Sequence, residues 1–272
     1  MRYILDNLRR IKRMLLSGGF AETVYLFLKE VEKEGGAFRH PDNKYLVNLS
    51  FDFELGYGTT FWYGNTEKAL VYGRAARRNF VPIARYLKES NTPANIQVVG
   101  RLLEPSEDRE LFHLTDEDLE LLKSPNFEIG LHGYSHKHFT EISREEAEYE
   151  MKTAVKNFEN SFFRQPEFMA FPKNRVAHRD IVRKYGIKCW RADNQHPSDE
   201  SEIPLGHWFA PGVLGRSDLK RLLDTIKIKR AGYFLHLWGH FTEMDVDTFR
   251  TLVETIKNAG WQLTTVKNFR NY

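Results

Sequence analysis

Carboxylates and histidines at the ends of predicted strands are the residues of this sequence best suited to carry chemistry. The stretch 46–54 begins as a mostly apolar run, which predicts a buried parallel strand, and it ends in Asp52 and Glu54. Residues two apart on a strand share a face, so both carboxylates point the same way. Active sites of α/β folds form at the carboxyl ends of strands. Taken alone, such a pair is more typical of a solvated strand end, and the interpretation depends on histidines further along the chain.

Two of these histidines have the spacing of metal ligands. A short apolar strand predicted over 127–132 ends in His132, and His136 follows four residues later. This spacing lets both imidazoles meet one ion, whether the segment is a helical turn or a strand-to-loop exit. Two histidines and one carboxylate are a common ligand set for catalytic zinc, with positions left open for water and substrate. The sequence therefore predicts a divalent metal site, with zinc as the first choice and iron, cobalt or nickel as alternatives.

A late predicted strand carries further histidines. Strand alternation places His236, Trp238 and His240 on one face, which suits a pocket wall as well as a core. A histidine near a metal ion but not bound to it is a candidate general acid, and His240 is better placed than His236 because it ends the strand. Glu243 is predicted to orient His240, and Trp238 to form an apolar wall beside the reacting group.

Strand and helix patterns alternate from residue 45 onward. We expect strands near 45–53, 95–100, 127–132, 168–172, 187–192, 207–211, 232–239 and 261–266, and helices near 65–89, 115–123, 143–162, 176–184, 216–227 and 245–258. Thr115, Ser143 and Asp245 are predicted N-caps, and Glu146 completes a capping box with Ser143. Repeated units of this length predict parallel strands with helices outside, in either a barrel or an open sheet.

The first 40 residues differ from the rest. Apolar residues at helical spacing over 2–16 and 22–33 are interrupted by basic residues and glycines. We interpret 1–40 as a helical extension packed on a single domain, 41–272. The alternative is a basic amphipathic helix that rests on an anionic membrane or on a partner.

Composition excludes several classes of protein. The 272 residues suit one large domain, and the net charge of +3, without a recognition motif, argues against a nucleic-acid-binding protein. The single cysteine, Cys189, rules out an intrachain disulfide and is predicted to be a buried thiol. No apolar run approaches the roughly 20 residues of a membrane span, and the N-terminus lacks a signal-peptide pattern. We therefore expect a cytoplasmic protein, with peripheral contact to the inner face of the membrane as a further option.

The order and spacing of these motifs resemble the polysaccharide deacetylase family, the NodB-homology carbohydrate esterases, over roughly residues 45–266. The first family motif is usually T-F-D-D-G. Here it reads Ser-Phe-Asp-Phe-Glu at 50–54, which is similar to a D-x-E variant of that motif. The resemblance implies that Asp52 is the catalytic base and that Glu54 binds the metal ion together with the two histidines of the second motif.

The third motif departs from the family pattern. It is normally R-x-P, and this chain keeps Pro172 but has Ala170 in place of the arginine that holds the base carboxylate. The hypothesis at this stage is that Lys173 or Arg175 substitutes from the following loop. The segment that ends in Asp193 resembles the family's Trp/Asp segment, which implies contacts from Asp193 to the base and to the catalytic histidine.

The family resemblance also implies a fold and a reaction. The fold would be a distorted (β/α) barrel of about seven or eight mainly parallel strands, and the late L-x-H motif would correspond to His240, or less well to His236. The reaction would be metal-assisted removal of an N-acetyl group from an amino sugar of a polysaccharide or its precursor. In it Asp52 accepts a proton from water and His240 protonates the leaving amine.

Three alternatives stay open at this stage. The first is an amide hydrolase of the same superfamily that acts on a small non-sugar substrate. The second is a glycan-binding homologue with impaired catalysis, because the motif arginine is missing. The third is a purely structural role for the acidic and histidine clusters, without a metal ion.

Overall fold

The computed structural model describes most of the chain from residue 43 onward. The described residues are 43–58, 67–105, 112–194, 198–208, 219–220, 223–224, 226–227 and 232–270. The predicted extension, residues 1–40, lies outside this part of the chain, so the extension and its boundary with the main domain remain predictions. Among the described residues there is no helix with the length and apolar content needed to cross a membrane.

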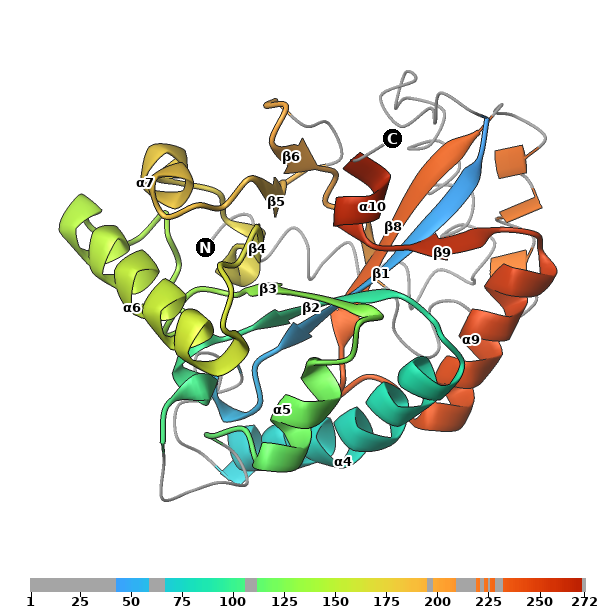
Figure 1. Cartoon of the computed structure of the whole chain (residues 1–272), viewed down its shortest axis with the longest axis horizontal. Helices are drawn as coiled ribbons and strands as arrows, with labels where there is room; N and C mark the ends of the chain where they lie inside the picture. Colours follow the sequence, from blue (N-terminus) through green and yellow to red (C-terminus); the bar gives the residue numbers. More distant parts are fainter. Residues whose placement is uncertain are drawn as a thin grey trace, which may run out of the picture.

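A curved parallel sheet forms the centre of the molecule, and its architecture is the predicted distorted (β/α) barrel (Figure 1). The strands are β1 (Tyr45–Phe53), β2 (Ala94–Val98), β3 (Phe127–Leu131), β4 (Phe168–Ala170), β5 (Cys189–Arg191), β6 (Glu202–Ile203), β7 (His207–Trp208), β8 (Tyr233–His240) and β9 (Gln262–Thr264). Eight of them follow the order β6-β5-β4-β3-β2-β1-β8-β7, and β9 pairs with β1 outside this order; every pairing between described strands is parallel. Because parallel strands align their carboxyl ends, the residues that follow β1, β3 and β8 meet at one end of the barrel.

The two faces of β1 explain its central position. Phe51 and Phe53 point towards the helices, where they stack on rings from the segment after β8 and from α4 (Glu67–Glu89). The alternate residues Asn48, Ser50 and Asp52 are buried on the opposite face, and the first two hydrogen-bond to side chains of β2. The apolar face therefore packs β1 against the helical layer. The polar face lines the barrel interior, and Asp52 lies on this face near the end of the strand.

Helices cover the outside of the sheet. Besides α4 they are α5 (Asp116–Leu122), α6 (Arg144–Phe162), α7 (Arg179–Lys184), α9 (Val246–Asn258) and α10 (Val266–Arg270), with short 3₁₀ turns η1 (Gly100–Leu103) and η2 (Pro172–Asn174). Figure 1 shows α4, α5 and α9 along one side of the molecule and α6 with α7 on another. Thr115, Ser143 and Asp245 cap their helices as predicted, and Ser143 forms the expected capping box with Glu146.

Several predicted elements are a few residues shorter in the structure: the helix predicted over 176–184 begins at Arg179, and the strand predicted over 187–192 runs from Cys189 to Arg191. The last predicted strand, 261–266, is shorter, because the chain turns into α10 at Val266, where Phe269 stacks on Phe234 of β8. The two-residue strand β6 was not predicted, because so short a segment carries no alternation that a pattern can reveal. Cys189 is a buried free thiol, as expected.

Candidate active site

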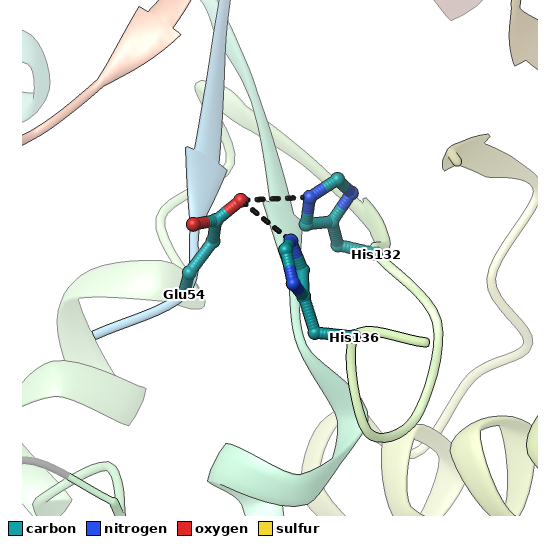
Figure 2. Close-up of side chains that lie close together, drawn as sticks. All are labelled: Glu54, His132 and His136. Carbon is teal, nitrogen blue, oxygen red and sulfur yellow. Dashed lines mark hydrogen bonds and ion pairs between the residues drawn. The ribbon is translucent and has the colours of Figure 1, made fainter. Parts of the chain in front are cut away.

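Glu54, His132 and His136 converge at the carboxyl end of the barrel (Figure 2). Glu54 follows β1 directly, His132 follows β3, and His136 lies in the loop after β3. The Nε2 atoms of both histidines lie 2.9 Å from the same carboxylate oxygen, Oε1 of Glu54. One potential ligand atom from each residue lies within 4.8 Å of the others. The structure thus brings together the three predicted metal ligands.

The hydrogen bonds of His132 indicate that a cation belongs among these atoms. Its Nδ1–H donates to the carbonyl oxygen of Ala170 at 2.8 Å, since a carbonyl can only accept. A neutral imidazole bonded in this way points the Nε2 lone pair at the Glu54 carboxylate, and two acceptors repel unless a proton or a metal ion lies between them. A histidine fixed through Nδ1 by a carbonyl is the usual arrangement behind a metal-binding Nε2. The ligand set fits a divalent ion such as zinc.

Electrostatics also favour an anionic Glu54. Burial alone would raise the pKa of Glu54, but the charges of His136 and His240, with the hydrogen bonds from His132 and His136, hold the pKa well below its usual range. Burial lowers the pKa of His136, and the Glu54 carboxylate offsets this only in part. An ionised carboxylate beside a neutral His136 imidazole is the state that metal binding requires.

Glu150 of α6 holds the loop that carries His136. Its buried carboxylate accepts hydrogen bonds from the N–H groups of Tyr134 and Ser135 at 3.0 and 2.9 Å and from the Ser135 hydroxyl at 2.5 Å. His136 has a φ of 63°, a left-handed conformation that costs a non-glycine residue energy. The three hydrogen bonds fix the preceding residues and so help to hold His136 in this conformation.

We expect Glu150→Ala to weaken metal binding by about 10–100-fold, the usual cost of losing an outer-shell partner. The reason is that the loop amides lose their acceptor and His136 loses its fixed orientation. Metal affinity can be measured by competition with a chromogenic chelator. The matched control is Glu148→Ala, on the same helix as Glu150. It removes a carboxylate that pairs with Lys184 of α7, and it should leave the metal affinity unchanged. A metal affinity of Glu150→Ala equal to that of the wild type would show that the loop does not need the hydrogen bonds to Glu150.

Gly58 provides the space that the Glu54 carboxylate occupies. A Cβ atom at position 58 would lie 1.5 Å from Glu54 Oε2 and 2.4 Å from its Cδ. We therefore expect Gly58→Ala to displace the carboxylate and to lower metal affinity at least about tenfold. Chelator competition measures the affinity, and circular dichroism checks that the fold is retained. A folded variant with wild-type affinity would contradict this assignment of Glu54.

Asp52 lies beside the three ligands, directly opposite His240 in the register of β1 and β8. Arg191 of β5 donates from Nη2 to Asp52 Oδ2 at 2.5 Å, while Oδ1 is buried with no hydrogen-bond partner among the described residues. Burial raises the pKa of Asp52, but the charges of Arg191 and of two nearby histidines outweigh it and lower the pKa. Asp52 is therefore an ionised carboxylate with one unpaired oxygen, which suits a proton acceptor.

His240 faces the same space from β8. Its Nδ1–H donates to Glu243 Oε1 at 2.8 Å, as predicted for an orienting carboxylate, and its Nε2 lies 3.6 Å from Glu54 Oε1. Burial lowers the pKa of His240, but Glu54 and Glu243 more than offset this and hold it well above its usual range. A protonated imidazole with its Nε2–H towards the site is the form that a general acid requires.

His236 is placed differently from His240. It is buried, its Nδ1–H donates to the carbonyl of Pro204, and burial lowers its pKa to about 3. Trp238, between the two histidines on β8, packs against the guanidinium of Arg191 at 4.7 Å and meets the His240 ring at 6.0 Å. Of the two histidines, only His240 borders the pocket described next.

An open pocket leads from the solvent to these groups. Asp52, Glu54, Tyr72, Lys173 and His240 are among its lining residues. Burial lowers the pKa of Lys173, and the two carboxylates counteract part of that shift. The pocket thus combines two acids, an imidazole, a lysine and an aromatic ring, a set suited to a polar substrate.

Two predicted contacts require correction. Asp193 is exposed and its carboxylate accepts a hydrogen bond from Asn194, so within the described residues it does not contact Asp52 or His240. The basic side chain that pairs with Asp52 is neither Lys173 nor Arg175. It is Arg191, two residues before Asp193. Pro172 packs against Gly133 in the loop between the two metal-site histidines. No spacing rule along the chain pointed to Arg191 or to Glu150.

Comparison with known proteins relates the chain to one family. Residues 64–190 match the family model described as polysaccharide deacetylase. The resemblance to the polysaccharide deacetylases is confirmed. No curated protein sequence matches the chain.

Solved structures related to polysaccharide deacetylases share the fold. A putative polysaccharide deacetylase from Mycobacterium smegmatis aligns with a TM-score of 0.60 and 14% identity, over 85% of this chain and 91% of that one. A family 4 carbohydrate esterase from Bacillus anthracis aligns with a TM-score of 0.53 and 16% identity, over 90% and 92% of the two chains. A CE4 family pseudoenzyme from Bacillus anthracis aligns with a TM-score of 0.51 and 16% identity, over 85% and 67%. At such identities the likeness concerns the fold alone.

Proposed function

We propose that this chain is a metal-dependent hydrolase that removes an N-acetyl group from an amino sugar of a polysaccharide or its precursor. One observation carries the proposal: Asp52 and His240 are register partners on β1 and β8, and they lie beside Glu54, His132 and His136, whose potential ligand atoms lie within 4.8 Å of one another. Amide hydrolysis needs a proton acceptor for water, a proton donor for the leaving nitrogen and stabilisation of the developing oxyanion. Glu54, His132 and His136 are the proposed metal ligands, with zinc as the first choice of ion.

The roles of the side chains follow from their positions. A bound divalent ion supplies Lewis-acid polarisation of a carbonyl oxygen and lowers the pKa of water. Asp52 Oδ1 accepts the proton of the attacking water, whose oxygen forms a bond to the acetyl carbon. His240 donates its Nε2 proton to the amide nitrogen as the carbon–nitrogen bond breaks. The products are acetate and a free amine, and Glu243 keeps the His240 ring in place through Nδ1.

Acetate release tests the proposal directly. The zinc-loaded protein is incubated with N-acetylglucosamine oligomers, and acetate is measured by an enzyme-coupled assay. We expect acetate in molar excess over protein, and no release after chelation. Release from a small non-sugar amide but from no acetylated sugar would favour the related amide hydrolases. Binding of the oligomers without release of acetate would favour a catalytically impaired glycan-binding protein. A pseudoenzyme has the same fold, so this alternative needs to be tested.

The contact between Glu243 and His240 predicts a shift in the pH profile. Glu243 raises the pKa of His240, so Glu243→Gln should lower that pKa. A general acid must be protonated, and the alkaline limb of the kcat profile should therefore move to lower pH, while the acidic limb stays in place. Steady-state kinetics between pH 5 and pH 10 at saturating substrate would show the shift. An unchanged alkaline limb would assign the proton donor to another group.

A further inference from the structure

Ala170 and Arg191 occupy paired positions on neighbouring strands. Ala170 ends β4 and Arg191 ends β5, and the two residues are partners in the parallel register of these strands. Paired residues of adjacent strands project from the same face of a sheet, about 5 Å apart. A long side chain at either position can therefore reach the same point in the barrel interior.

Arg191 is held at several points and has no exposure to solvent. Besides the bond from Nη2 to Asp52, its Nε donates to the side-chain oxygen of Asn174 at 2.7 Å, and its guanidinium packs on the Trp238 ring. Asn174 adopts a left-handed conformation, with a φ of 53°, directly after Lys173, which is also left-handed. The η2 turn thus provides an acceptor for the guanidinium at some conformational cost.

We propose that Arg191 is the positioning residue of the catalytic base, supplied by β5 in place of an arginine at position 170 on β4. The inference rests on the proposed function, because it concerns how Asp52 is presented to water. Arg191 donates to Oδ2, while Oδ1 has no hydrogen-bond partner among the described residues, so Oδ1 is the oxygen left to accept a proton. This arrangement makes the replacement of the motif arginine by Ala170 compatible with an active site.

A purely structural ion pair is the competing explanation. A buried pair is weak evidence for a function, since loss of either partner destabilises a fold whatever the pair does. The contacts to Asn174 and Trp238 orient the Arg191 guanidinium, and this orientation is separate from its charge. Lysine at position 191 keeps the charge but donates from a single nitrogen, without the planar fork. A lysine variant therefore separates orientation from charge compensation.

The test compares Arg191→Lys, Arg191→Ala and the exchange variant Arg191→Ala/Ala170→Arg with the wild type. Each protein is zinc-loaded, its metal content and thermal midpoint are recorded, and kcat and KM are measured on N-acetylglucosamine oligomers. Arg191→Lys should fold and keep its ion, with kcat reduced at least about 30-fold and KM changed less than about threefold. The exchange variant should regain at least about tenfold in kcat over Arg191→Ala. Arg144→Lys, at an exposed pair with Asp180, is the control and should match the wild type.

Two results would overturn the inference: wild-type kcat in a folded Arg191→Lys protein, or no recovery in a folded exchange variant. A wild type without acetate release would defeat the proposed function instead. The inference would then be decided by a thermal-unfolding double-mutant cycle of Arg191→Lys with Asp52→Ala, which removes the acceptor. Strongly non-additive changes support the oriented pair, and additive changes refute it.

Discussion

Replacement of Asp52 by asparagine is expected to lower kcat for acetate release by about 10²–10⁴-fold, the range of a lost general base. Asparagine has nearly the same shape and can still accept the hydrogen bond from Arg191, but it cannot take a proton from water. The metal ligands are unchanged, so the variant should keep about one ion per chain. Coupled acetate assays and elemental analysis of the same sample measure both quantities.

The matched control for this variant is Asp247→Asn, which removes an exposed carboxylate of α9 that pairs with Arg250. It should differ from the wild type by less than about twofold, because a surface pair contributes little. If Asp52→Asn retained wild-type kcat with its metal bound, another group would have to accept the proton. The register pairing of Asp52 with His240 would then have no catalytic meaning.

Replacement of His136 by alanine is expected to abolish stoichiometric metal binding, and with it acetate release at one equivalent of zinc. One of three protein ligands is lost, and the Glu54–His132 pair that remains is too small a set for a tight catalytic zinc site. His136 is the better choice than His132, whose bond to the Ala170 carbonyl also links β3 to β4. Elemental analysis after dialysis, together with the acetate assay, measures both effects.

A second histidine of the same loop provides the control. His138→Ala removes an imidazole that pairs with Glu141, and it should retain both the ion and the activity. A His136→Ala protein that still held one tightly bound ion would place the metal at a different set of ligands. The nearby group of Asp52, Glu54 and His240 would then be the first to examine.

Contacts that depend on neighbours along the chain could be predicted from the sequence. His132 and His136 share one turn of chain, so their local spacing indicated that they meet. Glu54 was expected at the same end of the sheet because it follows a strand by one residue. The orientation of His240 by Glu243 depends on a separation of only three residues. The parallel sheet followed from repeated apolar segments separated by helical ones, since that pattern has few other packing solutions.

Contacts set by strand register or by helix docking could not be predicted in this way. Arg191 reaches Asp52 because β5 pairs with β4 so that Arg191 lies opposite Ala170, and a register between strands leaves no mark on either segment alone. Position along the chain therefore indicated Lys173 and Arg175 as substitutes for the motif arginine, whereas the residue that pairs with Asp52 lies on the neighbouring strand. Glu150 was missed for a similar reason, because its contact depends on where α6 packs against the loop.

A zinc titration of the metal-free protein, with acetate release from N-acetylglucosamine oligomers as the signal, tests metal binding and hydrolysis together. We expect no acetate without zinc, a linear rise in rate, and a break at about one equivalent per chain. Bound zinc at one equivalent without acetate release would contradict the hydrolase proposal and favour a glycan-binding protein. Absence of any zinc binding would contradict the site formed by Glu54, His132 and His136 itself.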